Sequence, residues 1–440
     1  MKKLFFLLLC ILSFHRLSAQ ENSEPDLRRF IGINSHLSYK MLENNQDIRK
    51  LDILLNEKRK GALDNSILII GTSITALADY QKTNTESKFA YLMRHPTAAN
   101  EIGMEVSEAV LHSFQLSVTG SVNNWLTMYA EILYDPEQSF GAGTITSLTR
   151  NQLQLRRGII AFGDLNKFPL YGAIGKFDAP FGMMGSVNPF SNTSMWHAFA
   201  GLGYGALAGF TKWNLNASVM AIQGGAQFRG LNTPVGDSTN VPSKLNNFAA
   251  DINYTFIIHD DYSLKLGGSY LYGSAYNQEF PVIHFGPGKS NNPAYTFYGV
   301  FSFRNILLME GGYVTTVNVW PGTHNPNPPL DVFEASKVSS IDAGIKYTFN
   351  ADGKIPISAS AEFSKFISGP EGSPWQRQNQ IIVGFSSEIN KSVRFFTEYF
   401  RTVGYTPLNF ISGGNLAPGK THSDRDVNTF GIVLGGMVTL

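Results

Sequence analysis

The feature that most constrains this chain is an alternation of apolar and polar residues with a period of two, which recurs from near Gly61 to the last residue. The clearest stretch is 248–256, where apolar side chains such as Ile252 alternate with Asp251 and Asn253. Successive side chains of a β-strand point to opposite faces of the sheet. Each such stretch therefore predicts a strand with one face suited to lipid and one suited to water.

The same pattern predicts about sixteen strands, each near the roughly 9–11 residues that cross a bilayer at a tilt. They span 66–79, 107–119, 124–135, 148–162, 169–178, 196–208, 211–222, 246–257, 262–274, 294–303, 306–318, 338–349, 355–367, 379–389, 392–404 and 428–440. Short connections such as Arg304-Asn305 alternate with long ones such as 319–337 and 406–427. This alternation of connection lengths is typical of outer-membrane barrels, whose even strand number puts both termini on the periplasmic side.

We therefore predict an all-β fold, a transmembrane antiparallel β-barrel of about 16 strands over residues 64–440. The final strand alternates up to Leu440, and aromatic residues near strand ends, such as Tyr254 and Tyr347, fit the interfacial girdles of such barrels. A soluble β-sandwich is the competing fold, but it would need about half this length. After the first twenty residues, no stretch reaches the about 18 uninterrupted apolar residues of a membrane helix.

The first residues have the form of a signal peptide. A basic head at Lys2 and Lys3 precedes an apolar core at 4–14 and a small-residue cleavage site that ends at Ala19. We expect residues 1–19 to be removed, so that the mature chain begins at Gln20 and passes through the envelope to the cell outer membrane.

Residues 20–63 are predicted to form a periplasmic segment that is partly helical. Its apolar residues recur at roughly helical spacing among charged and amide residues; they are Leu37, Met41, Ile48, Leu51 and Leu55. A solvated linker with helical tendency is the alternative interpretation.

Composition and motifs exclude several classes of protein. Cys10 is the only cysteine and leaves with the predicted signal peptide, so we expect no disulfide, thiol nucleophile or cysteine-bound metal. The formal net charge is +1 and no basic block is present, which excludes a nucleic-acid partner. The chain has no H-E-x-x-H or G-x-S-x-G motif. We therefore expect neither an enzyme nor a cofactor. The candidate partners are outer-membrane lipid, a small-molecule solute and further copies of the chain in a homo-oligomer.

A barrel of this size encloses an aqueous channel that wall side chains alone cannot fill. The alternation predicts which charged residues line this channel: Arg156, Lys176, Asp178, Lys212, Asp251, Lys265, Glu310, Asp342, Lys346, Glu362, Glu388, Arg394 and Glu398. Both signs of charge are present, so no simple ion preference follows. The alternative for any one of these residues is that it only solvates the lumen or pairs with a neighbour.

One predicted outer connection, 179–195, is unusually apolar. Its large apolar side chains include Phe181, Met183, Met184 and Phe190. Because exposed apolar groups at this density favour burial, we expect the loop to fold into the barrel and narrow the channel. Packing on neighbouring outer loops or on a partner subunit is the alternative.

Two segments carry a specific resemblance. YGAIGKFDAPFG at 171–182, preceded by VNNWLTMYAEILYD at 122–135, is similar to the LbtU-type siderophore porins. The G-K-x-x-x-P-F-G element also occurs in phosphate-selective-type porins. The resemblance covers about 65–199 and implies passage or reception of a ferric siderophore without a plug domain, together with a helical segment before the barrel. It transfers no ligand-binding residue.

The sequence thus favours an outer-membrane, porin-like channel for small solutes, with a siderophore as the solute that the family resemblance implies. A barrel-embedded hydrolase and an adhesin or structural barrel are the alternatives from other classes; the last would conduct no current. An energy-coupled receptor with a plug does not fit, because only about 40 residues precede the barrel and a plug with about 22 strands needs far more.

Overall fold

The computed structural model describes residues 31–43, 45–46, 49–63, 65, 67–89, 103–135, 152–223, 227–228, 245–276, 291–389, 392–407, 411–414 and 416–440. The predicted signal peptide and Ile48 lie outside these residues.

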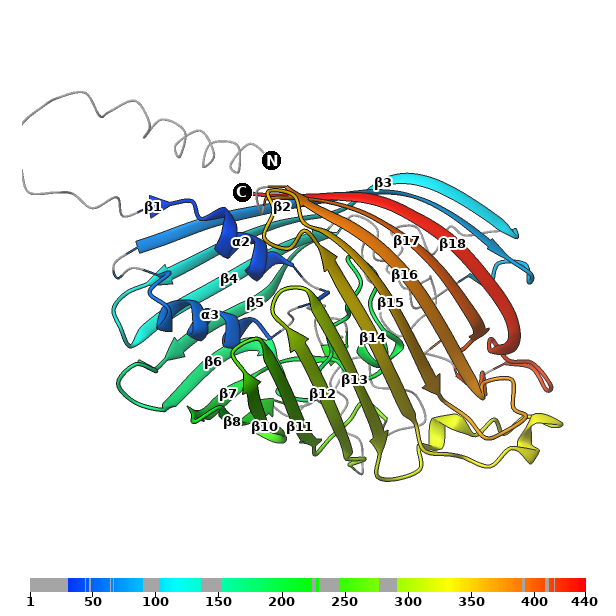
Figure 1. Cartoon of the computed structure of the whole chain (residues 1–440). Helices are drawn as coiled ribbons and strands as arrows, with labels where there is room; N and C mark the ends of the chain where they lie inside the picture. Colours follow the sequence, from blue (N-terminus) through cyan, green and yellow to red (C-terminus); the bar gives the residue numbers. More distant parts are fainter. Residues whose placement is uncertain are drawn as a thin grey trace, which may run out of the picture.

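Sixteen strands of the described residues form a closed antiparallel ring, which confirms the predicted fold class (Figure 1). They are β2 (Ile67–Thr83), β3 (Glu105–Ser121), β4 (Leu126–Asp135), β5 (Gln152–Phe162), β6 (Leu170–Asp178), β7 (Gly201–Lys212), β8 (Leu215–Gln223), β10 (Leu245–His259), β11 (Tyr262–Leu271), β12 (Ala294–Phe303), β13 (Leu307–Thr316), β14 (Ser339–Phe349), β15 (Ile357–Ile367), β16 (Arg377–Ile389), β17 (Val393–Tyr405) and β18 (Asp424–Thr439). The ring closes where β18 pairs with β2, with Leu434 opposite Ala78. Two short strands accompany it: β1 (Ile31–Gly32) pairs parallel to β2, and β9 (Gln227–Phe228) pairs antiparallel to β7.

The two faces of the wall differ as the alternation predicts. On β10, the outward Ile252 is 56% exposed, whereas the inward Asp251 is 4% exposed. On β18, Leu434 is 56% exposed and its neighbour Val433 is fully buried. The outer surface of the ring is therefore apolar along the strands, whereas the inner surface combines polar and charged side chains with buried apolar ones such as Val433. No helix among the described residues is long and apolar enough to span a membrane.

The connections at the two ends of the ring differ in length. At one end β7 and β8 are joined through Trp213 and Asn214, whose φ angles of 53° and 64° are those of a two-residue hairpin turn. Other short turns and the C-terminus lie at the same end, which we call the short-turn end. The opposite, long-loop end carries connections such as Thr83 to Glu105 and Thr316 to Ser339. The latter contains the 3-10 helices η3 (Pro321–Thr323) and η4 (Leu330–Val332).

Three α-helices are described, and none belongs to the wall. In the N-terminal segment, α2 (Ser35–Leu42) and α3 (Lys50–Arg59) replace the single helix expected from sequence. The Asn34 side chain caps α2 by accepting from the Leu37 N–H at 3.0 Å. The Lys50 ammonium, at the start of α3, donates to the carbonyls of Lys40 and Glu43 at the end of α2. The two helices thus form one compact unit.

The third helix corrects one predicted boundary. Residues 196–199, predicted as the start of a strand, belong to α4 (Ser194–Phe199), and β7 begins at Gly201. The Thr193 side chain accepts from the Trp196 N–H at 3.0 Å and starts this helix, all of whose residues are buried. Tertiary burial inside the ring therefore overrides the local alternation here.

Closure of the ring makes a testable prediction. Each backbone hydrogen bond of the ring is shared between neighbouring strands, so no strand can unravel alone and the barrel should resist detergent. We expect the unboiled protein to migrate faster in detergent gel electrophoresis than the boiled protein. Equal mobility of the two samples, together with a helix-rich circular dichroism spectrum, would contradict the fold.

Candidate functional site

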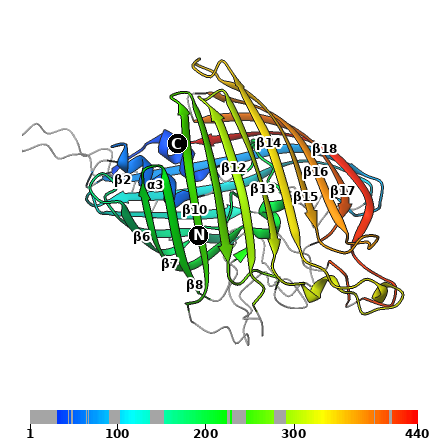
Figure 2. The same cartoon turned by 60° about the horizontal axis from the view of Figure 1, so that its bottom comes forward.

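The inside of the ring is filled rather than open. Inward polar side chains in the middle of the wall are almost fully buried: Glu131 and Glu398 are 0% exposed and Arg157 is 2% exposed. In a water-filled channel, such side chains would retain contact with solvent. Two parts of the chain occupy the space: the described residues of 35–59, which we call the N-terminal insert, and residues 179–200, which we call the inward loop (Figures 1 and 2).

One side of the N-terminal insert is apolar and packs on the wall. Leu37, Met41 and Leu54 belong to a single buried cluster with the inward-facing side chains of Tyr129 and Ile159. The helix α2 contacts β2, β3 and β18, and α3 contacts β5 and β6. Full burial of a leucine side chain stabilises a fold by about 1.5–3 kcal/mol, so this face holds the insert against β2–β6.

The other side of the insert is polar and is held by an ion pair. Nη1 and Nη2 of Arg49 lie 2.9 and 3.1 Å from the two carboxylate oxygens of Asp251 on β10. Asp251 also accepts from the side chains of Ser269, Asn253 and Tyr298, at 2.5, 2.8 and 2.9 Å. The carboxylate is therefore both charge-compensated and hydrogen-bonded, as a buried carboxylate must be.

A second polar contact joins α2 to β16 and β17. Nη1 of Arg394 lies 3.5 Å from Glu43, and its Nη2 lies 3.1 Å from Glu388. The Tyr39 hydroxyl donates to Glu388 at 2.7 Å, and the Arg394 guanidinium lies 4.9 Å from the Tyr39 ring centroid. Burial alone would raise the pKa of Glu43, but Arg394, Lys50 and two backbone N–H donors outweigh it and lower this pKa from its usual value. Glu43 is thus held as a carboxylate.

The inward loop is bound by two carboxylates of the wall. Glu362 on β15 accepts from the Ser186 hydroxyl and the Asn188 amide, both at 2.6 Å, and from the Val187 N–H at 3.2 Å. Glu398 on β17 accepts from the N–H groups of residues 190 and 191 at 2.7 and 3.1 Å, and from the Ser191 hydroxyl at 2.5 Å. Charge-assisted hydrogen bonds of this kind are the strong ones, so the two glutamates fix the path of the loop.

Apolar side chains of the inward loop complete its attachment. Phe181 and Met184 are each 2% exposed and Phe190 is 5% exposed, while Met183 is half-buried. The Phe190 ring stacks on Phe396 of β17, with centroids 5.3 Å apart and ring planes within 8°. The inward loop therefore lies inside the ring, attached by both polar and apolar contacts.

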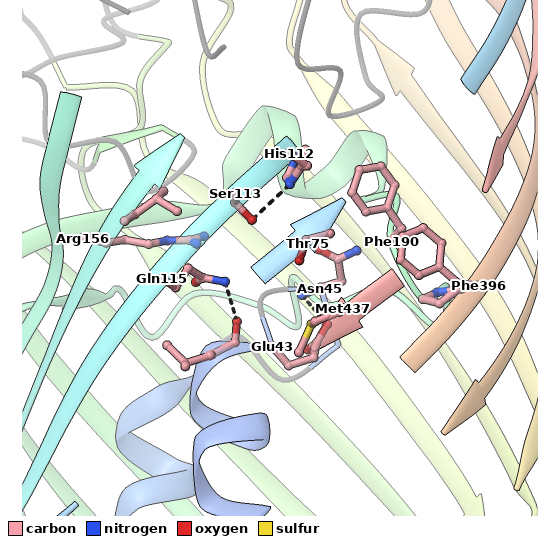
Figure 3. A pocket seen from close by; sticks show the side chains of 13 residues that line it. Glu43, Asn45, Thr75, His112, Ser113, Gln115, Arg156, Phe190, Phe396 and Met437 are labelled. Carbon is pink, nitrogen blue, oxygen red and sulfur yellow. Dashed lines mark hydrogen bonds between the residues drawn. The ribbon is translucent and has the colours of Figure 1, made fainter. Parts of the chain in front are cut away.

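A small pocket remains between the two inserts and the wall (Figure 3). The insert contributes Glu43 and Asn45, and the stacked rings of Phe190 and Phe396 form the opposite side. The wall contributes further polar side chains; these are Thr75, His112, Ser113, Gln115 and Arg156. Gln115 donates to the Leu42 carbonyl at 3.2 Å, and His112 shares a hydrogen bond of 3.2 Å with Ser113.

Not all predicted lining residues face this interior. Lys212 is exposed at the short-turn end, with its ammonium 4.3 Å from the Trp213 ring centroid. Its position alternates with the inward-facing positions of β7, so its side chain faces outward and not into the lumen as predicted. Lys176 is buried in the wall, where it donates to the Leu155 carbonyl at 3.1 Å and lies 5.6 Å from the exposed Tyr204 ring.

The sequence interpretation missed Glu131 and Arg157. Arg157 donates to Asp178 at 2.7 and 2.9 Å and to Glu131 at 2.9 Å, and Arg156 lies 3.6 Å from Glu131. The register between β4 and β5 shifts next to Arg156, so adjacent arginines are both buried. A strict period of two cannot predict such a bulge, although the inward Glu131 lies within the segment that carries the family resemblance.

The described wall is more accessible on the side away from the insert. Lys265 is exposed, and Glu310 and Lys346 are half-buried. The register places Lys265, Glu310 and Glu362 in one row across β11–β15. We call the space lined by Lys265, Glu310 and Lys346 the vestibule. It ends at the insert, where Lys346 donates to the Gln46 side chain at 3.1 Å. Within the described part of the chain, no group of three or more His, Cys, Asp or Glu side chains could hold a metal ion.

Comparisons with known proteins support the fold but no specific family. No family model matches the chain. A curated relative from Coxiella burnetii, described as a UPF0422 protein, is 23% identical over 309 residues, which are 69% of this chain and 60% of that protein. The chain therefore spans less than two thirds of its relative's length.

Two solved barrels are similar in structure. An anion-selective porin from Comamonas acidovorans superimposes with a TM-score of 0.50 at 10% identity, over 85% of this chain and 99% of that one. OprB from Pseudomonas putida gives a TM-score of 0.52 at 9% identity, over 84% and 94%. This chain shares the porin barrel fold, and its closed ring with an apolar outer surface places it in an outer membrane.

The contacts of Glu398 predict how the inward loop is held. Hydrogen bonds to charged groups contribute about 1.5–3 kcal/mol, so Glu398→Ala should accelerate hydrogen exchange of the 190 and 191 amides by about ten- to a hundredfold. Exchange measured by mass spectrometry would resolve this segment. Glu371→Ala, which removes an exposed glutamate of the β15–β16 connection, is the control. Unchanged exchange at 190 and 191 in the Glu398 variant would show that these contacts do not hold the loop.

Proposed function

We propose that this chain is an outer-membrane channel for small solutes, in which two inserts from the chain itself narrow the lumen. The observation that carries the proposal is the inner wall of the vestibule, where the charged side chains of Lys265, Glu310 and Lys346 keep contact with solvent in a ring that packs apolar side chains outward. A barrel that served only as an anchor would have no need of charged residues on its inner wall, whereas a route for polar solutes requires a polar lining.

The proposed route begins in the vestibule. The short turns and the C-terminus mark the periplasmic end of barrels of this type, so the vestibule would open to the periplasm. The charges along the route are mixed, since Lys265 and Lys346 alternate with Glu310 and Asp342. We therefore propose passage of small polar solutes with a selectivity set by these few side chains. Assembly of several copies in the membrane remains part of the proposal.

A ferric siderophore is the more specific solute that the family resemblance supports. A solute of that size cannot pass while both inserts fill the lumen, so this more specific proposal requires at least one insert to move. The alternative that the filled lumen favours is a structural or adhesin barrel, which would conduct no current whatever the state of its inserts.

Deletion of residues 181–190 tests the channel directly. The inward loop fills the lumen at the level of Glu362 and Glu398, so its removal should raise the single-channel conductance in a planar bilayer and admit larger solutes. The deletion variant must still show the change in gel mobility on boiling. If no current is found for the wild-type protein or for a correctly folded deletion variant, with or without Arg49→Ala, the chain is a structural barrel and the proposed function is wrong.

The two vestibule lysines make a separate prediction about selectivity. Replacing Lys265 and Lys346 together by Glu should shift the reversal potential in a salt gradient towards cations, because both face the proposed route. Lys212→Glu changes the charge in the same way at the outer side of the short-turn end, and should leave the reversal potential unchanged. An equal shift in the two proteins would mean that the vestibule is not on the route.

A further inference from the structure

We infer that the N-terminal insert is an autoinhibitory plug, which closes the channel from the short-turn end and is latched there by the contact between Arg49 and Asp251. The inference rests on the proposed channel function. It assigns a regulatory role to a segment that the sequence predicts to be a periplasmic helix before the barrel.

The topology allows the insert to leave without threading through the ring. Ile31, before the insert, pairs with Leu68 at the start of β2, and α3 leads directly into the same strand. The Lys58 ammonium at the end of α3 binds Ser121 at the end of β3, Asn123 in the following turn and Thr127 on β4. Both ends of the insert are therefore fixed at the short-turn end, and only its middle reaches into the lumen.

The middle of the insert meets the inward loop through direct contacts. The Ser186 N–H donates to the Asn45 carbonyl at 2.8 Å, and Arg49 Nη2 donates to the Gly182 carbonyl at 2.6 Å. The Gln46 amide lies 3.4 Å from the carbonyl oxygen of Val187. A Cβ atom at Gly185 would overlap the Gln46 carbonyl, so a glycine is required for this close approach. The two inserts thus form one barrier across the lumen.

The contacts on the vestibule side suit a latch. The insert holds β2–β6 through buried apolar side chains but meets the vestibule wall through Arg49 and Gln46. Polar groups regain hydrogen bonds from water when such contacts separate, whereas apolar groups do not. Opening should therefore begin on the vestibule side.

The surroundings of Asp251 make its contact with Arg49 separable. The Asp251 side chain is fully buried. The Arg49 side chain is 23% exposed, on the side of the insert that faces the vestibule. If Arg49 leaves, the hydroxyls of Ser269 and Tyr298 and the amide of Asn253 still donate to the carboxylate. Asp251 then keeps hydrogen-bond donors in the open state, which lowers the cost of breaking the pair.

Thiol labelling at Asn45 tests displacement of the insert. Asn45 is 6% exposed where the middle of the insert meets the inward loop, with its carbonyl accepting from the Ser186 N–H, and the mature chain is predicted to contain no cysteine. An Asn45→Cys protein in lipid vesicles should react slowly with a membrane-impermeant maleimide. Adding Arg49→Ala should accelerate the reaction by about tenfold or more, since removal of one partner from a buried ion pair strongly favours separation.

Control variants separate the latch from general destabilisation. Lys60→Ala also removes one positive charge near the end of the insert. Because the Lys60 side chain is 65% exposed, this substitution should leave the labelling rate unchanged. Arg49→Ala with Asp251→Asn, which leaves no unpaired charge, should still label fast. The exchange of charges in Arg49→Asp with Asp251→Arg should restore slow labelling.

The outcomes distinguish this inference from the channel proposal. If Arg49→Ala, alone or with Asp251→Asn, does not accelerate labelling, and the loop-deletion variant conducts, the proposed latch is wrong but the channel proposal stands. Fast labelling that depends on Arg49, with no current from any folded variant, would overturn the channel and leave a displaceable insert. Fast labelling with raised conductance supports the plug.

Discussion

The structure depends on one constraint: within a bilayer, every backbone N–H and C=O of the wall must be hydrogen-bonded inside the protein. Pairing of β18 with β2 meets it by closing the ring. A closed ring of sixteen strands is wider than its own side chains can fill. Here the space is taken by polypeptide, which supplies partners for several of the buried charges of the wall. Arg49 compensates Asp251, and the backbone of the inward loop satisfies Glu398.

The wall could be predicted from sequence because its signal is local. The bounds of β12 agree with the predicted 294–303, and apolar side chains such as Ile252 and Leu434 face outward as the alternation requires. The contents of the lumen could not be predicted in the same way. The spacing of Leu37 and Met41 indicates an amphipathic helix but not the surface that it covers, which proves to be the inner wall. The exclusion of an energy-coupled receptor considered only a large separate plug domain, and it did not predict that helices within 35–59 and the inward loop fill the lumen.

Other failures have equally specific causes. Residues 196–199 alternate weakly but form a helix, because the Thr193 side chain caps it and the lumen buries it. Lys212 is predicted to lie in the strand at 211–222 but ends β7, where its position faces outward. The pair Arg156 and Arg157 depends on a shift of register between two strands, which a single sequence does not reveal. Local periodicity predicts on which side of a strand or helix a residue lies, but the tertiary contacts determine which part of the chain packs against that side.

The central claim is that the N-terminal helices lie inside the barrel, and a disulfide between Ser38→Cys in α2 and Gly71→Cys in β2 tests it most directly. A Cβ at residue 71 would lie 2.7 Å from the Cβ of Ser38, close enough for a disulfide after a small adjustment. Mild oxidation should join the two cysteines in nearly every molecule in the membrane, as shown by the altered mobility of the boiled, unreduced protein and its reversal by a reductant. If both cysteines instead remain free and react with thiol reagents, the helices lie outside the ring and the account is contradicted.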